Sequence, residues 1–425
     1  MSFFTCGNAT RRELMFGAAA AMSAGGAARP LILLRSGWQT ENIGDIAHTP
    51  GVLTLIKKHI PEARVALWSF ALDRGVEPML KRAFPGLITV GDKTPEPGSA
   101  LKQLMDEAAI CLHGSGPSVV AWQQLEVWRK ATGRPYGVFG VTVTAQSEAA
   151  SGAPNEQQKL VMAGSKFLFT RETESLGNVR SMGLKGVETA FVPDGTFSVT
   201  LRDEEKAGRF IRENGLEPGK FICVIPRLRY TPYHKFRKAA YSEQAARERD
   251  AENARTKHAD AAKLREVIIA WVRQTGGRAL LCPEMEYQLE ELKPLLEDPL
   301  PEDVKKRVVR RKDYWITDEA ASVYARSAGV VSSECHSPIL AVAAGVPCFY
   351  VRQAQDGIKG QMWADVGVGD WAPKIEEVTA EGLAKLVMAT LSDQNKARAR
   401  ARAAAEKAQK LQAWGMGVVR KTIGL

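Results

Sequence analysis

The sequence lacks the residue spacings that mark the common metal and nucleotide sites. Its six cysteines include no Cys-x-x-Cys or Cys-x-x-His pair, so we expect no structural zinc site, no other bound metal and no disulfide framework. Gly-x-Gly-x-x-Gly, Gly-Lys-Ser/Thr and Gly-x-Ser-x-Gly are all absent. These absences leave dinucleotide binding, Walker-type nucleotide binding and serine hydrolysis without support. We therefore predict no bound cofactor.

Long apolar runs are also missing. No segment approaches about 18 uninterrupted apolar residues, so no membrane span is predicted. The first 28 residues have a different character: Thr10–Met15 contains a twin-arginine pair, and the Ala-rich stretch Phe16–Met22 and small residues follow. We predict that residues 1–28 are a twin-arginine signal peptide and that the protein is periplasmic or otherwise extracytoplasmic. A disordered basic start on a cytoplasmic protein is the alternative.

Acidic residues are outnumbered by basic ones. The chain has 58 Lys and Arg against 48 Asp and Glu, a net charge of +10 over 425 residues. This surplus suits an anionic partner such as a phosphorylated small molecule or an acidic glycan, and a solvated basic surface explains it as well. A nucleic-acid partner has only the charge in its favour, and we do not expect one.

Short apolar runs alternate with amphipathic stretches in two successive sets, which predicts βαβ units and parallel sheets. The expected fold class is α/β, with two doubly wound Rossmann-like domains facing a cleft. The first domain covers residues 29–205 and the second residues 215–392, with a charged insertion at 233–257. Residues 393–425 should form a helical tail whose arginines at 398, 400 and 402 face solvent. The predicted strands are Pro30–Leu34, Arg64–Phe70, Leu87–Val90, Ala109–Leu112, Pro135–Val143 and Phe167–Thr170, then Phe221–Pro226, Arg278–Cys282, Val308–Arg310, Gly329–Ser332 and Cys348–Val351.

Two glycine-bearing loops follow strands of the first set. In paired domains of this kind the site lies at the carboxyl ends of both sheets, and glycines there let backbone N–H groups approach an anion. For the first loop a plain N-cap at Asp45 stays open, and for the second a tight turn without a ligand. The candidate binding residues are Asn42, Gly44 and Asp45 in the first loop, and His113, Gly114, Ser115 and Gly116 in the second.

Charged residues follow three further strands. Arg171 stands where an arginine clamps a carboxylate or phosphate, unless it forms a surface pair with Glu174. Arg227 and Arg229, among aromatic residues, suit an anionic sugar or simply a solvated loop. Glu334 and His336 lie where a strand turns into a helix, so both would face the cleft as acid and base, or His336 would only cap the helix.

These elements, in this order, resemble the polysaccharide pyruvyl transferase family from about Leu31 to about Trp371. The family's Asn-x-Gly-Asp element is similar to residues 42–45, and its Arg-Asp/Glu-x-x-Ser element to residues 171–175. Its late histidine precedes a helix and a strand that starts with Gly-x-Pro. The matching residues are Asn42, Gly44, Asp45, Arg171, Ser175, Gly183, Asp194, His336, Gly345, Pro347 and Lys359.

The resemblance implies a glycosyltransferase-B-like fold and transfer of pyruvate from phosphoenolpyruvate, as co-substrate, to a sugar hydroxyl pair as a ketal in polysaccharide modification. The partners would be an anionic small-molecule donor and a glycan acceptor. Under the resemblance His336 would act as acid or base, while Arg171 and one of Arg227 and Arg229 would hold phosphate and carboxylate. The candidate catalytic residues are His336, Glu334, from its place at the strand end, and Asp194.

At one position the chain departs from the family. The family carries an arginine two residues before the histidine, where this chain has Glu334. A carboxylate there repels an anionic donor. An exported protein of the same fold with a lost or altered donor, which binds or modifies acidic glycan, is therefore the alternative function.

Overall fold

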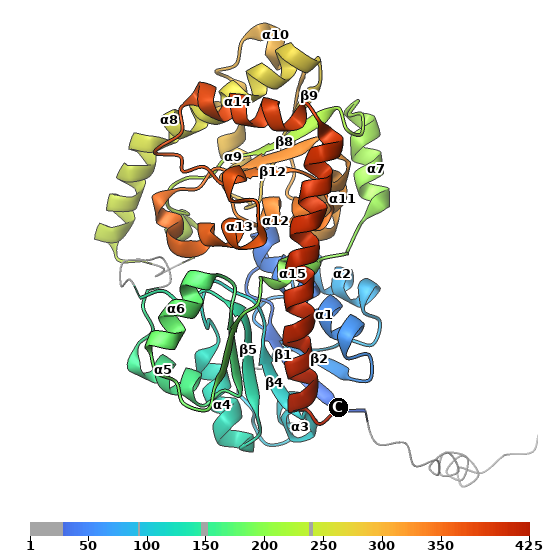
Figure 1. The fold of residues 1–425 in the computed structure, drawn as a ribbon, viewed down its shortest axis with the longest axis vertical. Coiled ribbons are helices and arrows are strands. Elements are labelled where there is room, and N and C mark those ends of the chain that lie inside the picture. Colours follow the sequence, from blue (N-terminus) through green and yellow to red (C-terminus); the bar gives the residue numbers. More distant parts are fainter. Residues whose placement is uncertain (1–28, 92–93, 146–151, 238–240) are drawn as a thin grey trace, which may run out of the picture.

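The computed structural model describes residues 29–91, 94–145, 152–237 and 241–425, and it contains two parallel β-sheets, each covered by helices (Figure 1). The predicted signal peptide lies outside the described residues. The fold class is confirmed: the protein has two doubly wound α/β domains and a C-terminal helix. Among the described residues, no helix combines the length and apolarity that crossing a membrane requires.

The first domain is built on a seven-stranded sheet in the order β3-β2-β1-β4-β5-β6-β7. Six strands were predicted. The seventh, β7, was missed because its side chains are only partly buried, so it shows no apolar run. The strands are β1 (Leu31–Ser36), β2 (Arg64–Ser69), β3 (Ile88–Val90), β4 (Ile110–His113), β5 (Tyr136–Val141), β6 (Phe167–Thr170) and β7 (Glu188–Phe191); the helices are α1 (Ile43–His59), α2 (Val76–Ala83), α3 (Ala100–Glu107), α4 (Trp122–Thr132), α5 (Glu156–Ala163), α6 (Thr173–Ser181) and the short η1 (Gly195–Ser198).

The second domain is built on a five-stranded sheet in the order β10-β9-β8-β11-β12, and all five strands were predicted. The charged segment expected as an insertion leads into the first half of the long helix α8. The strands are β8 (Phe221–Ile225), β9 (Arg278–Leu281), β10 (Val308–Arg310), β11 (Gly329–Ser332) and β12 (Cys348–Tyr350); the helices are α7 (Glu204–Glu213), η2 (Tyr233–Lys235), α8 (Glu243–Thr275), α9 (Gln288–Leu292), η3 (Lys293–Glu297), α10 (Glu302–Lys305), α11 (Thr317–Arg326), α12 (His336–Ala343), η4 (Ala354–Gly360), α13 (Gln361–Val366), η5 (Gly369–Trp371), α14 (Ala380–Leu391) and α15 (Gln394–Thr422).

Strand order determines which loops meet. The chain reverses its direction of winding between β1 and β4 in the first sheet and between β8 and β11 in the second. Loops at such a switch point diverge and leave a crevice at the carboxyl ends of the strands. The loops after β8 and β11 carry Arg227, Glu334 and His336, so the topology brings these three residues to one place.

Helix α1 begins earlier than the sequence predicts. The prediction placed residues 36–45 in a loop, whereas the structure starts the helix at Ile43. Asn42 is the N-cap residue, and its side chain accepts hydrogen bonds from the backbone N–H groups of Gly44 (2.7 Å) and Asp45 (3.3 Å). Asp45 is therefore not the N-cap, and its carboxylate accepts a hydrogen bond from the Gln39 side chain instead.

Two residues inside α1 explain the missed start. Pro50 and Gly51 both disfavour helices, and the prediction therefore began the helix only at Gly51. In the structure, a Cβ atom on Gly51 would lie 2.2 Å from the carbonyl oxygen of Gly195. The glycine marks a close packing contact between α1 and η1, not a helix boundary.

The C-terminal helix α15 returns to the first domain, which the prediction of a solvated tail did not foresee. In Figure 1 it runs in red from the second domain down the side of the first. Its alanines at 397, 401, 404, 405 and 408 are buried. Arg400 and Arg402 are exposed as predicted, but Arg398 is half-buried and donates a hydrogen bond to the Ser327 carbonyl (2.6 Å).

One polar side chain of α15 supports the candidate site. Gln412 is fully buried, donates a hydrogen bond to the carbonyl oxygen of Asp194 (2.6 Å) and accepts one from Ser198 (2.7 Å). We expect Gln412→Leu to lower the free energy of unfolding by about 1–3 kcal/mol, because it leaves buried polar groups without partners. Urea unfolding measures this, and Gln103→Leu, at an exposed glutamine that also donates to a backbone carbonyl, should change little. Equal effects of the two variants would contradict the prediction.

Candidate active site

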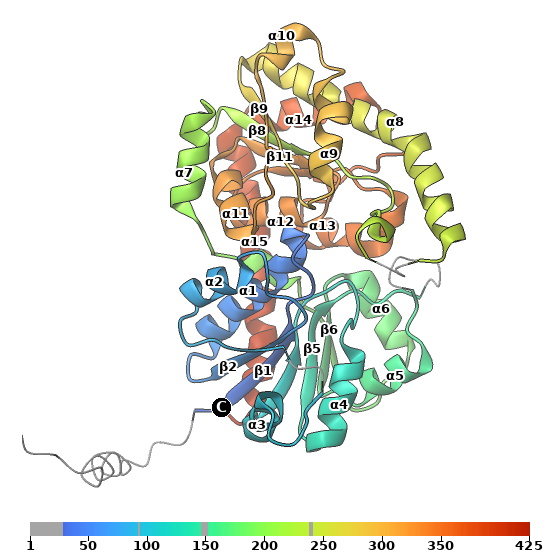
Figure 2. The ribbon, with the colours of Figure 1, turned by 180° about the vertical axis from the view of Figure 1, so that it is seen from behind.

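The start of α1 lies against the second domain. Ile43 donates its backbone N–H to the carbonyl of Glu284 (3.0 Å), and Thr317 donates its hydroxyl to the carbonyl of Ile43 (2.6 Å). Figure 2 shows the blue start of α1 next to α12 of the second domain. The Asn-x-Gly-Asp element, residues 42–45, therefore lies where the two domains meet, a place that we call the domain seam.

Gly44 and His336 are in direct contact across this seam. A Cβ atom on Gly44 would lie 2.4 Å from Cγ and Nδ1 of the His336 imidazole and 2.5 Å from its Cβ. Such distances do not occur between real side chains, so no larger residue fits without displacing the histidine. The glycine thus lets the histidine of one domain approach the helix of the other.

His336 has a carboxylate neighbour that sequence reasoning missed. Its Nδ1 lies 3.5 Å from Oε1 of Glu284, which is fully buried in the segment after β9. Burial alone would raise the pKa of Glu284, but the nearby His336 and Ser337 lower it. Ser337 donates its backbone N–H to the other carboxylate oxygen (2.6 Å). Glu284 therefore orients both the histidine and the start of α12.

A second histidine, also missed, lies beside the first. The rings of His48 and His336 are 4.8 Å apart in an edge-to-face arrangement. His48 Nδ1 lies 3.0 Å from Oδ1 of Asp194, and both side chains are fully buried. Burial alone would raise the pKa of the Asp194 carboxyl, but His48 and Arg171 hold that pKa well below its usual range. Because α1 was predicted to start only after residue 50, the one-turn spacing of Asp45 and His48 went unnoticed.

Arg171 forms hydrogen bonds with carboxylates of the protein itself. Its guanidinium donates to Asp194 (2.8 Å), to Glu172 (3.1 Å) and to Thr142 (2.7 Å), and only 1% of its side chain is exposed. Ser175 donates to Glu172 (2.6 Å) and is likewise buried. The alternative of a surface pair between Arg171 and Glu174 is wrong. Arg171 thus holds the Asp194 carboxylate in place, and Ser175 holds Glu172.

Glu334 lies in a separate charged cluster next to His336. It accepts a hydrogen bond from Gln288 (2.8 Å), and its other oxygen lies 3.5 Å from Nε of Arg227. Arg227 also pairs with Asp356, which lies 3.5 Å from Nζ of Lys359. Burial raises the pKa of Glu334 to about 8, so the carboxyl holds its proton over much of the neutral range and repels an anion less than a carboxylate does.

Arg229, the other arginine of the loop after β8, lies apart from Glu334. It pairs with Asp260 of α8 through two hydrogen bonds of 2.6 and 2.9 Å, and with Glu376. These contacts tie the loop to neighbouring elements. Of the two arginines, Arg227 is the one next to the motif residues.

The loop after β4 has internal partners. His113 Nδ1 lies 2.7 Å from the Gly114 carbonyl, its Nε2 accepts from the Ala121 N–H (3.2 Å), and burial lowers its pKa to about 3. Ser115 accepts a hydrogen bond from the N–H of Gly195 (2.8 Å). Gly116 pairs with β5 through a bridge to Val141. This arrangement favours the tight turn that was left open over an anion-binding loop.

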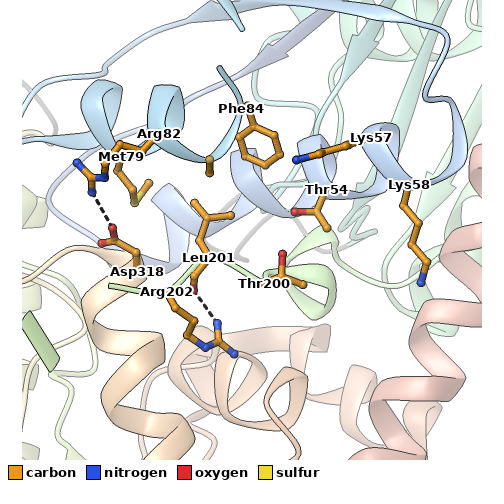
Figure 3. Close-up of a pocket in the computed structure, with 11 residues that line it drawn as sticks. Thr54, Lys57, Lys58, Met79, Arg82, Phe84, Thr200, Leu201, Arg202 and Asp318 are labelled. Carbon is orange, nitrogen blue, oxygen red and sulfur yellow. Dashed lines mark hydrogen bonds and ion pairs between the residues drawn. The ribbon is translucent and has the colours of Figure 1, made fainter. Parts of the chain in front are cut away.

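A cavity of about 690 Å³ lies away from His336, between α1, α2, α11 and residues 200–202, which connect the two domains (Figure 3). Its charged lining residues are Lys57, Lys58, Arg82, Arg202 and Asp318, and Arg82 pairs with Asp318 (3.1 Å). None of the motif residues lines it. The candidate active site is therefore the seam around His336, whose groups come from both domains.

Comparison with protein families identifies the chain. A model of the family polysaccharide pyruvyl transferase matches residues 42–354, more than half of the sequence, starting at the N-cap of α1. The chain belongs to the polysaccharide pyruvyl transferase family. Gly44 and His336, which meet at the seam of this pyruvyl transferase family member, are among the residues that carried the resemblance in sequence. No curated protein sequence is similar enough to serve as a relative.

Solved structures show the same fold at low sequence identity. HepE from Anabaena, in complex with UDP and glucose, has 12% identity and a TM-score of 0.55 over 92% of this chain and 100% of HepE. UDP-GlcNAc 2-epimerase from Neisseria meningitidis, bound to UDP-GlcNAc, has 11% identity and a TM-score of 0.54 over 92% and 99%. UGT2 from Phytolacca americana has 12% identity and a TM-score of 0.52 over 92% and 99%. The fold of this pyruvyl transferase family member is thus that of glycosyltransferase-B proteins.

Proposed function

We propose that this protein transfers pyruvate from phosphoenolpyruvate to two hydroxyl groups of a sugar and closes them into a cyclic ketal. Both sugar oxygens form bonds to C2 of the donor, C3 gains a proton and becomes a methyl group, and phosphate leaves C2. Of the two hydroxyl protons, one balances the proton delivered to C3 and the other leaves with phosphate. Membership of the family supports the reaction class, and the donor and the ketal are our proposal.

The observation that carries the proposal is the meeting of motif residues from both domains at one seam. Gly44 of the first domain contacts His336 of the second, and Glu334, two residues before His336 in the chain, pairs with Arg227. A cleft between two such domains is the place where this fold class joins a donor to an acceptor.

We assign the donor's anionic groups to Arg227 and Lys359. Both cations lie next to Asp356 and within the cluster that contains Glu334. A planar guanidinium suits a carboxylate or phosphate through paired hydrogen bonds. Glu334 and His336, at the start of α12, are the groups placed to move the protons of the reaction, and Asp194 supports them from the first domain.

The second candidate function keeps the scaffold and changes the donor. Its support is Glu334 at the position where the family carries an arginine. An acidic group at this position replaces the cation that the family carries there. It also pairs with a second cation, Arg227. A protein of this kind binds or modifies acidic glycan without using phosphoenolpyruvate.

Calorimetric titration of phosphoenolpyruvate into the full-length protein tests the proposal. We expect binding with a micromolar Kd, and a loss of about 10–100-fold in Arg227→Gln, because a hydrogen bond to a charged group contributes about 1.5–3 kcal/mol. Arg229→Gln is the matched control: it removes a paired arginine of the same loop that lies apart from Glu334, and it should keep the affinity. Thermal unfolding shows whether both variants remain folded.

The variant Glu334→Arg separates the two candidate functions. If the unmodified protein binds no phosphoenolpyruvate and Glu334→Arg does, the scaffold has kept the family site but changed its donor. If neither binds, the pyruvyl-transfer proposal is wrong.

A further inference from the structure

Two histidine–carboxylate pairs face each other at the domain seam. His48 and Asp194 belong to the first domain, with 3.0 Å between Nδ1 and Oδ1. His336 and Glu284 belong to the second, with 3.5 Å between Nδ1 and Oε1. In metal sites a ligating histidine commonly has a carboxylate at its other ring nitrogen, which fixes the tautomer and the ring orientation.

The remaining ring nitrogens lack hydrogen-bond partners. Nε2 of His48 and Nε2 of His336 are both buried. Within the part of the chain that the structure describes, neither atom accepts or donates a hydrogen bond. The His48 side chain is fully buried and that of His336 is 12% exposed. A buried imidazole nitrogen without a partner is costly, so such atoms call for a ligand.

The donor atoms are close enough to share one ion. One ligand atom each of His48, Asp194 and His336 lies within 4.8 Å of the others. Around a tetrahedral ion with bond lengths of about 2.1 Å, ligand atoms are separated by about 3.4 Å. Oδ1 of Asp45 lies 3.9 Å from Nε2 of His48, on the side of the ring away from Asp194, and is a candidate third ligand.

Charge at the seam also favours a cation. The carboxylates of Asp45, Asp194 and Glu284 lie within 4 Å of ring nitrogens of the two histidines, and Arg171 pairs with Asp194. When both histidines are neutral, the negative charge of these carboxylates exceeds the positive charge of the arginine. A divalent ion would offset this excess.

We propose that His48 and His336, through their Nε2 atoms, bind a divalent transition-metal ion such as Zn²⁺, with Asp45 as a third protein ligand and with Asp194 and Glu284 as the carboxylates that orient the two rings. Imidazole nitrogen together with carboxylate oxygen suits this class of ion better than Mg²⁺ or Ca²⁺. The ligands come from both domains, so the ion would join them at the seam. The inference does not depend on the donor, and a His336 that holds the ion leaves the proton transfer of the proposed reaction to Glu334.

The test uses the full-length protein, freed of metal with a chelator and titrated with Co²⁺ while its visible absorption is recorded. Histidine-ligated Co²⁺ should give d–d bands that saturate at one ion per chain and disappear when Zn²⁺ is added. We expect His48→Asn and His336→Asn each to weaken binding at least 100-fold, and Glu284→Gln to weaken it about 10–100-fold as a positioning residue.

His234→Asn is the matched control. His234 also pairs with an aspartate, Asp250 (3.0 Å), and is not one of the residues grouped around the two facing rings. The His234→Asn variant should keep the Co²⁺ spectrum and the Co²⁺ affinity of the unmodified protein. An unmodified protein without d–d bands, or a His48→Asn protein that binds as well as the unmodified one, overturns the proposal.

A second readout covers variants that fold poorly. If the ion joins the two domains, Zn²⁺ should raise the Tm of the unmodified protein and of His234→Asn in a concentration-dependent way. No rise in the unmodified protein overturns the inference. Neither readout contains phosphoenolpyruvate or a glycan, so failure of the metal site and failure of pyruvyl transfer are seen separately.

Discussion

Replacing Arg171 with leucine is expected to lower the free energy of unfolding by about 3–5 kcal/mol, because it removes one partner from a fully buried ion cluster. Asp194 and Glu172 both accept hydrogen bonds from this guanidinium, and both are inaccessible to solvent. Leucine fills part of the volume but leaves two carboxyl groups in a medium that disfavours their charge.

Urea unfolding followed by circular dichroism measures the loss. Arg273→Leu is the control, since Arg273 also pairs with an acidic residue, Asp303, but with both side chains more than half exposed. Its effect should be small, because exposed ion pairs contribute little to stability. A loss of less than about 1 kcal/mol in Arg171→Leu would show that the cluster rearranges or that its carboxyl groups are already neutral in the folded protein.

The sequence was sufficient to predict the fold because parallel sheets bury their strands on both faces. Continuous apolar runs therefore marked eleven strands, all of which the structure contains. β7, with an exposed Glu188 and half-buried neighbours, gave no such run. The strand order, which decides which loops meet, follows from long-range pairing and not from any local pattern.

The candidate site was predictable in its residues but not in their partners. Gly44 contacts His336, and Asn42 caps the helix that carries Gly44. Arg171 was expected to hold a substrate anion and instead holds Asp194 and Glu172, because an arginine at a strand end shows its charge in the sequence but not its neighbours.

His48 illustrates a different limit. It becomes visible only once α1 is known to start at Ile43, which places it one turn after Asp45 on the same face. Pro50 and Gly51 hid that start. Tertiary packing of α1 against η1 overrides the local preference of these two residues, which is the usual reason why helix boundaries resist prediction.

Gly44→Ala is the second change with a large expected effect. In the first turn of a helix, alanine is intrinsically favoured over glycine by up to about 1 kcal/mol. At Gly44 the added methyl group would overlap the His336 ring and its Cβ, so the histidine or α1 must move. We expect a net loss of about 1–3 kcal/mol in the free energy of unfolding, as for other overpacked interiors, and an at least 10-fold loss of Co²⁺ affinity if His336 is a ligand.

Gly177→Ala provides the comparison. Gly177 also lies in a helix, α6, but a Cβ atom there would meet no heavy atom within 4 Å. This variant should gain a few tenths of a kcal/mol or more from helix propensity alone. If Gly44→Ala is stabilised in the same way and keeps its metal affinity, the contact between Gly44 and His336 does not exist in solution. The glycine of the Asn-x-Gly-Asp element would then serve α1 alone, and the two domains would not share a site at this seam.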